Sequence, residues 1–238
     1  MPRMAKAESW SDNFDDGVRD TSLWSTGGTT DTKTSLSESG GVLSFNAAGL
    51  SSSDQSSKNY NSTWMVDFTQ DFQFTAKYNN SSSISGGQYG GVELGLHTLS
   101  SSFELWTSAE NSWNAGTGTA GKIFDAAIEN QSFDVQTNRP DSGLIGVRYT
   151  AGAADTLAFL GTNTAGETAV IAEYANFKSK FNPDPLHVYL RGWSEGANFN
   201  ASFDDFQGSV SPEPISAALF LLGGASLVIK HYRKKNTV

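Results

Sequence analysis

Apolar and polar residues alternate along the whole of Phe72-Gln73-Phe74-Thr75-Ala76-Lys77-Tyr78-Asn79. Strict alternation places the two sets of side chains on opposite faces of a β-strand. The apolar face of such a strand has to be buried against a second layer of structure. This segment therefore predicts a half-buried strand in an antiparallel sheet.

The same period of two recurs between Glu8 and Val210. Other alternating segments contain Leu43 and Phe45, Val92 to Leu96, Phe103 and Leu105, Ile145 to Tyr149, and Leu186 to Leu190. Turn-forming runs of Gly, Asn, Asp, Ser and Pro separate them. Many short strands without amphipathic helices predict an all-β sandwich of two packed sheets rather than a βαβ fold. One segment, Ala169–Phe181, fits either a strand or a helix, and we favour a strand there.

Composition excludes several classes of protein. The chain has 238 residues, a formal charge of -9, no cysteine and only 17% charged residues. An apolar content in the globular range argues against disorder, and the low charged fraction argues against a coiled coil. An acidic chain without a basic stripe disfavours nucleic acid as a partner. The absence of cysteine rules out disulfides and thiolate metal sites.

The charge is divided unevenly along the chain. Up to Glu213 there are 25 acidic and 12 basic residues, whereas residues 215–238 carry no acid. The four basic residues at the end are Lys230, Arg233, Lys234 and Lys235. They follow an uncharged run, Ile215 to Ile229, which as a helix would span about 22 Å, less than the roughly 30 Å hydrocarbon core. The basic flank favours a transmembrane helix with its basic end in the cytoplasm, and a plain tail anchor or a buried helix is the alternative.

The motif Pro212-Glu213-Pro214 stands directly before this run. With the apolar run and the basic end, it resembles the PEP-CTERM sorting signal of Gram-negative bacteria. The resemblance covers residues 211–238: the motif at 212–214, the membrane helix at 215–229 and the basic tail at 230–238. It implies recognition by an exosortase, transient anchoring in the inner membrane, cleavage near the motif, and export to the cell surface or an exopolysaccharide matrix.

An exported protein is expected to carry a signal peptide. Residues 1–7 contain no apolar region, but Ala5-Lys6-Ala7 has the small-x-small form that a signal peptidase cleaves. We therefore interpret residues 1–7 as the remnant of a longer signal sequence or start region.

The two ends of the body, residues 8–210, contain related motifs. One is Asp12-Asn13-Phe14-Asp15-Asp16-Gly17, and the other is Ala201-Ser202-Phe203-Asp204-Asp205-Phe206. This pair resembles the first and last strands of the concanavalin A-like lectin/glucanase jelly roll. The resemblance implies that these strands lie side by side. Another β-sandwich or a β-barrel is the alternative.

Laminarinase-type glucanases of this fold use a Glu-x-Asp-x-x-Glu strand, which presents two catalytic carboxylates on one face. That spacing is absent here. Glu104 and Glu110 are six residues apart without the central Asp, and we favour reading them as solvated strand and turn residues. We therefore expect a non-enzymatic structural or polysaccharide-binding protein, with a carbohydrate-active enzyme as the alternative.

Two kinds of binding site remain open. The paired aspartates Asp15, Asp16, Asp204 and Asp205 offer oxygen ligands that suit a structural calcium ion, although they could equally cap turns or face solvent. Trp106, Trp113, Tyr89 and Trp193 are candidate platforms for sugar rings, although most aromatic residues must fill the core. His97, His187 and His231 have no second ligand at metal spacing, so we infer no zinc site.

Overall fold

The computed structural model describes residues 8–82, 84, 88–98, 103–114, 119–129, 131–181 and 183–211. The predictions for residues 1–7 and for the tail, including Pro212, Glu213, Pro214, Lys230, Arg233, Lys234 and Lys235, lie outside these residues. Within the described part, no helix is long and apolar enough to cross a membrane.

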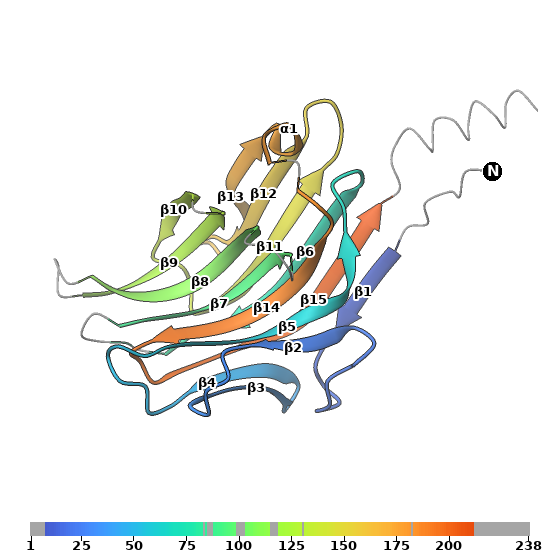
Figure 1. The fold of residues 1–238 in the computed structure, drawn as a ribbon. Coiled ribbons are helices and arrows are strands. Elements are labelled where there is room, and N and C mark those ends of the chain that lie inside the picture. The colour runs from blue at the N-terminus through green and yellow to red at the C-terminus, as the bar shows by residue number, and fades with distance from the viewer. Residues whose placement is uncertain are drawn as a thin grey trace, which may run out of the picture.

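Two antiparallel sheets form the body, as predicted (Figure 1). The eight-stranded sheet has the order β13-β12-β11-β6-β15-β4-β3, with β1 beside β15, and the seven-stranded sheet has the order β10-β9-β8-β7-β14-β5-β2. The elements are β1 (Glu8–Asp12), β2 (Trp24–Gly28), β3 (Thr34–Ser39), β4 (Val42–Ala47), β5 (Gln55–Val66), β6 (Asp71–Asn79), β7 (Tyr89–His97), β8 (Glu104–Asn114), β9 (Thr119–Ile128), β10 (Gln131–Thr137), β11 (Ser142–Thr150), β12 (Thr156–Thr162), β13 (Thr168–Ala175), α1 (Phe177–Phe181), β14 (Leu186–Glu195) and β15 (Phe199–Ser211).

The hydrophobic core lies between the sheets and is rich in aromatic rings. On β6, the predicted alternation is confirmed, because Phe72, Phe74, Ala76 and Tyr78 are all buried. On β7, Val92, Leu94 and Leu96 belong to the same core, so the residues between them face outward. The sandwich is thus held by the apolar faces that the sequence pattern identifies.

The first and last strands lie side by side, which confirms the arrangement that the terminal motifs imply (Figure 1). β1 pairs antiparallel with β15, and Asp12 stands opposite Phe206. The indole Nε1 of Trp24 donates a hydrogen bond of 2.8 Å to Asp12 Oδ2, and the Trp24 ring packs edge-on against Phe206. These contacts fasten the two ends of the body together.

The prediction of a strand over Ala169–Phe181 is right only for its first part. β13 ends at Ala175, and Phe177–Phe181 forms the short helix α1. Between them, Asn176 has a left-handed φ of 56° and breaks the strand. The helix begins where Asp155 Oδ2 accepts the backbone N–H of Lys178, an interaction across 23 residues that local periodicity cannot reveal.

Candidate functional site

The outer face of the seven-stranded sheet carries a cluster of charged and aromatic side chains from β7, β8 and β14. On β14, Arg191 stands opposite Glu93 of β7. The Arg191 Nε donates to Glu93 Oε2 at 2.5 Å, and its Nη2 donates to Glu104 of β8. The Tyr189 hydroxyl also donates to Glu104, at 2.6 Å, while the guanidinium of Arg191 lies over the Tyr189 ring. Three strands are therefore linked through one arginine.

Burial changes the protonation behaviour of this cluster. Burial raises the pKa of the Glu93 carboxyl, and the guanidinium of Arg191 opposes this rise. Burial also raises the pKa of the Tyr189 phenol well above its ordinary value, so the phenol remains a hydrogen-bond donor. The cluster is consequently a fixed network of donors and acceptors rather than a group of freely solvated charges.

Glu110 is the second buried carboxyl on this face. Its side chain belongs to a residue that is 8% exposed, and Ser108 Oγ donates to its Oε1. Burial raises the pKa of Glu110 to about 8, so this carboxyl is mainly neutral at pH 7. The expectation that Glu110 is a solvated residue is therefore wrong, whereas Glu104 keeps a side chain that is 28% exposed and is bound by Arg191 and Tyr189. The register of β7 and β8 sets Glu110 opposite Gly91 and Ser108 opposite Glu93, and so places Glu93 and Glu110 diagonally across neighbouring strands.

Two glycines on β7 let aromatic rings of β14 lie close to the sheet. A Cβ atom at Gly91 would stand 2.9 Å from Trp193 Nε1, and one at Gly95 would stand 2.8 Å from both the Tyr189 ring and Trp106 Cβ. Larger residues at these positions would push the rings away from the strand. The absence of side chains at Gly91 and Gly95 of β7 thus shapes the outer face as much as the aromatic side chains of β14 do.

A cavity of about 410 Å³ opens on this face beside β5 and β14. Its lining includes Thr29, Gln55, Ser56, Glu93, Trp193 and Glu195. The indole Nε1 of Trp193 is buried and has no hydrogen-bond partner among the described residues. A buried donor without a partner is unusual in a folded protein and points to a ligand or water that completes it.

The four predicted sugar platforms are placed differently. Trp193 lines the cavity, whereas Trp106 is partly buried next to Tyr189 at Gly95. Tyr89 is 37% exposed at the start of β7, where it stands opposite Glu195. Trp113 belongs to β8, and its side chain lies outside the described part of the chain. Sequence reasoning missed Glu93, Tyr189 and Arg191, although the outward positions of the β7 and β14 alternations would have pointed to them.

The predicted calcium ligands do not assemble. Asp15 accepts from Asn13, Asp16 accepts the backbone N–H of Val18, and Asp205 forms an ion pair with Lys77. Asp204 accepts the backbone N–H of Asp205. No group of three or more His, Asp or Glu side chains in the described residues could hold a metal ion. Asp16 thus accepts a backbone N–H within its own turn, as the alternative of turn caps predicts, and the calcium site stays a prediction.

The histidines are closer together than their sequence spacing suggests. His97 of β7 stands opposite His187 of β14 and, on its other side, opposite Glu104 of β8. Their side chains have other partners: His187 Nδ1 lies 2.7 Å from the Ser62 carbonyl oxygen, and the His97 ring packs edge-on against Tyr189. Cross-strand pairing therefore brings His97 and His187 together although they are 90 residues apart in the sequence. His231 lies outside the described residues.

The two-sheet antiparallel arrangement is the concanavalin A-like lectin/glucanase fold. The sequence matches no protein-family model and no curated protein. Solved structures nevertheless share the fold. Lectin I from Ulex europaeus, in complex with the methyl glycoside of α-L-fucose, is 12% identical with a TM-score of 0.64, covering 87% of this chain and 99% of that chain.

Two further structures extend the comparison. The Bauhinia forficata lectin in complex with GalNAc is 11% identical with a TM-score of 0.52, covering 87% of this chain and 99% of that chain. An immunostimulatory antigen and pseudo β-1,3-glucanase of Mycobacterium tuberculosis is 11% identical with a TM-score of 0.53, covering 85% and 98%. At this level of identity the likeness shows the fold alone.

Proposed function

We propose that this protein is a polysaccharide-binding β-sandwich whose ligand lies on the outer face of the seven-stranded sheet. The observation that carries the proposal is the Trp193 side chain at a cavity bordered by polar side chains, with a buried Nε1 that has no hydrogen-bond partner among the described residues. A Trp ring offers an apolar face for the C–H groups of a sugar and an N–H for one of its oxygens. The other residues of the cavity lining are polar or charged, and they can form hydrogen bonds with the hydroxyl groups of a sugar.

The structural neighbours support this proposal indirectly. Two of them are lectins with a sugar derivative bound, and they share the two-sheet architecture. The sandwich core accounts for Trp24, which is fully buried, but not for Trp193 at the cavity. The neighbours and the position of Trp193 therefore favour the same kind of ligand.

Affinity electrophoresis of the full chain through gels containing a panel of soluble polysaccharides tests the proposal. We expect retardation by at least one polysaccharide and its loss in Trp193→Ala. Val170→Ala serves as the control, because Val170 is exposed on β13 of the other sheet. The proposal is contradicted if none of the polysaccharides retards the protein. It is also contradicted if Trp193→Ala and the parent protein are retarded equally.

A second candidate function is glycoside hydrolysis, which the diagonal placement of Glu93 and Glu110 favours. Hydrolysis needs one protonated carboxyl to donate a proton to the leaving oxygen and one carboxylate to act as nucleophile or base. A reducing-sugar assay separates the candidates. Turnover that is lost in Glu110→Gln or Glu93→Gln supports an enzyme, and binding without turnover supports the binding protein.

We also propose that the protein is exported and sorted to the cell surface or an extracellular matrix by an exosortase. The support is the order of Pro212-Glu213-Pro214, the apolar run and the basic end. Intact-mass measurement of the native protein from its own host reports both ends of the chain. A mass that lacks the segment after the motif is expected, and the full mass in the cytosol contradicts this part of the proposal.

A further inference from the structure

We infer that the cavity on the outer face selects uncharged polysaccharides over those with carboxylate groups, and that Asp31 contributes to this selection from behind the cavity wall. The inference rests on the proposed function and names the ligand class for the same site. It is based on the sign of the charged side chains around the cavity and on which side chains there can donate hydrogen bonds.

Among the described residues that line the cavity, no basic side chain is left without an acidic partner and thus available to an anionic ligand. Arg191 is the one Lys or Arg among the described lining residues. It is already paired with Glu93 and Glu104 and also donates to the Tyr189 hydroxyl at 2.9 Å. Recognition of a ligand carboxylate normally uses an unengaged arginine or lysine. Here a ligand anion would have to break an existing network.

Acidic groups of the lining also oppose an anion. Glu93 and Glu195 both border the cavity. A carboxylate brought next to like charges in a partly enclosed site is disfavoured, and such juxtaposition is a common source of specificity. Among the described lining residues the two acids outnumber the single base, Arg191, and this balance disfavours uronic acids.

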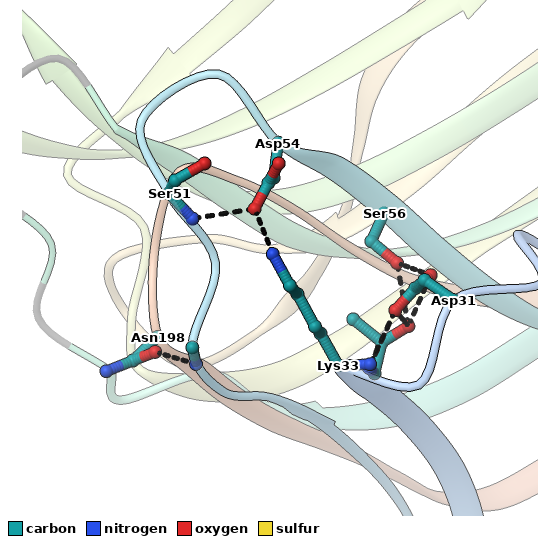
Figure 2. Close-up of polar contacts among 8 residues, drawn as sticks. Asp31, Lys33, Ser51, Asp54, Ser56 and Asn198 are labelled. Carbon is teal, nitrogen blue, oxygen red and sulfur yellow. Dashed lines mark hydrogen bonds and ion pairs between the residues drawn. The ribbon is translucent and has the colours of Figure 1, made fainter.

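Asp31, in the loop between β2 and β3, fixes the hydroxyl groups of one cavity wall. It accepts hydrogen bonds from the hydroxyls of Thr29, Ser56 and Thr34. It also accepts the backbone N–H of Lys33 at 2.8 Å (Figure 2). The donors from Ser56 and Thr29 hold the pKa of Asp31 well below its usual range, so its carboxylate is ionised at neutral pH.

This arrangement sets which hydrogen-bonding atoms the wall offers. Each hydroxyl has a single hydrogen, and bonds to an ionised acceptor are the stronger ones. The hydrogens of Thr29 and Ser56 are therefore kept within the Asp31 cluster, so neither hydroxyl offers its hydrogen to the cavity. Thr29 Oγ1 also accepts the backbone N–H of Ser57, and it lies 2.8 Å from Ser56 Oγ. A ligand must donate to this wall, as a sugar hydroxyl can and a carboxylate cannot.

Neutral donors complete the match to an uncharged sugar. The side-chain amide of Gln55 and the indole N–H of Trp193 both belong to cavity residues. They can donate to hydroxyl, ring or glycosidic oxygens without a formal charge. A polyhydroxylated chain supplies both donors and acceptors, whereas a carboxylated chain lacks donors where the wall needs them.

The test compares one polysaccharide in three chemical forms. The probes are a neutral polysaccharide that retards the full chain, the same polymer after oxidation of its primary alcohols to carboxylates, and the oxidised polymer after methyl esterification. We expect the oxidised form to bind about tenfold or more weakly, as is usual for a mismatched polar group in a built site. The ester should bind more tightly than the oxidised form because its charge is removed.

The outcomes distinguish the inference from the proposed function. Binding of the oxidised polymer as tightly as the neutral polymer overturns the inference and leaves the proposed function standing. Binding of no polymer overturns both. Equal weakness of the ester and the oxidised form assigns the loss to the missing donor hydroxyl, and so overturns the part of the inference that rests on charge.

The contribution of Asp31 is tested with a matched pair of variants. Asp31→Asn introduces amide donors next to Ser56. It should lower the ratio of the affinity for the neutral polymer to the affinity for the oxidised polymer several-fold. Asp54→Asn makes the same change of charge in the neighbouring loop, but Asp54 accepts from Lys33 Nζ and Ser51 N rather than from the wall hydroxyls (Figure 2). Equal changes in both variants contradict a role of Asp31 through the hydroxyl groups.

Asp31→Asn also removes an anchor of the β2–β3 loop, so its folding is checked by urea denaturation. Ser56→Ala is an independent test of this wall of the cavity, because it removes the Ser56 hydroxyl oxygen and leaves the Asp31 carboxylate in place. We expect it to weaken binding of the neutral polymer several-fold. Unchanged binding in Ser56→Ala contradicts the use of this wall by the ligand.

Discussion

Trp193 lies across Gly91, so closely that a Cβ atom at position 91 would stand 2.9 Å from the indole Nε1. The same atom would stand 3.2 Å from both the Ala109 carbonyl oxygen and Glu110 Cγ. We expect Gly91→Ala to displace the indole, weaken polysaccharide binding roughly tenfold and cost about 1–3 kcal/mol of stability. Binding assays and urea denaturation of the same preparation measure the two effects.

Gly192 gives a contrasting case on the neighbouring strand. A Cβ atom there would point into the core, 2.2 Å from Cγ of the buried Phe45. Because core packing cannot relax easily, Gly192→Ala should lower the free energy of unfolding by about 3 kcal/mol or more. The matched control is Ser209→Ala at an exposed position of β15, which should change stability by less than about 0.5 kcal/mol. Similar urea midpoints for the two variants would falsify this account of the core.

Arg191 holds two carboxylates, so its removal should be costly. Arg191→Ala leaves Glu93 and Glu104 without their partner, and we expect a loss of about 3–5 kcal/mol. Arg191→Lys should restore only part of this, because an ammonium group cannot bridge both acids with the planar fork of a guanidinium. Lys77→Ala is the control, since its ion pair with Asp205 is exposed and should contribute no more than about 1 kcal/mol.

Glu110 should make stability depend on pH. Its pKa is raised to about 8 by burial, whereas an unfolded Glu titrates near about 4.3. Between these values the folded protein binds more protons at this site than the unfolded chain, so the contribution of Glu110 to stability falls as pH rises. Below about pH 4.3 both states are protonated, and the contribution is constant.

The comparison of Glu110→Gln with the parent protein isolates this effect, because burial also raises the pKa of Glu38, to about 7. We expect the variant to be equally stable near pH 4 and more stable than the parent by on the order of a few kcal/mol near pH 9. Urea denaturation across this range measures the difference. A difference that does not change with pH contradicts the burial of an unpaired carboxyl at position 110.

Removal of divalent cations tests the calcium hypothesis. Asp16 and Asp205 have protein partners, and no described cluster of His, Asp or Glu could hold a metal. We therefore expect EDTA and added calcium to leave the melting temperature unchanged. A rise of the melting temperature with calcium, abolished by Asp16→Asn or Asp205→Asn, would restore the calcium site that the sequence pattern suggested.

The period of two in Phe72 to Asn79 was enough to predict a strand and its buried face, and the recurrence of that period between Glu8 and Val210 predicted the two-sheet fold. The reason is that the alternation of a strand is local, and burial of its apolar face follows from the hydrophobic effect. The paired terminal motifs likewise predicted that β1 lies beside β15, which the structure confirms. The charged tail pattern remains a prediction, because it concerns residues outside the described part.

The candidate site depended on the tertiary structure. Glu93, Glu104 and Arg191 are far apart in sequence and meet only because β7, β8 and β14 pair in one register. The alternation along each strand indicates which side chains face outward, but which residues of distant strands stand opposite one another depends on the pairing of those strands, and no local pattern specifies that pairing. The burial of Glu110, the place of Trp193 over Gly91 and the turn from β13 into α1 arise in the same way, from contacts between distant strands that form only when the whole sandwich closes.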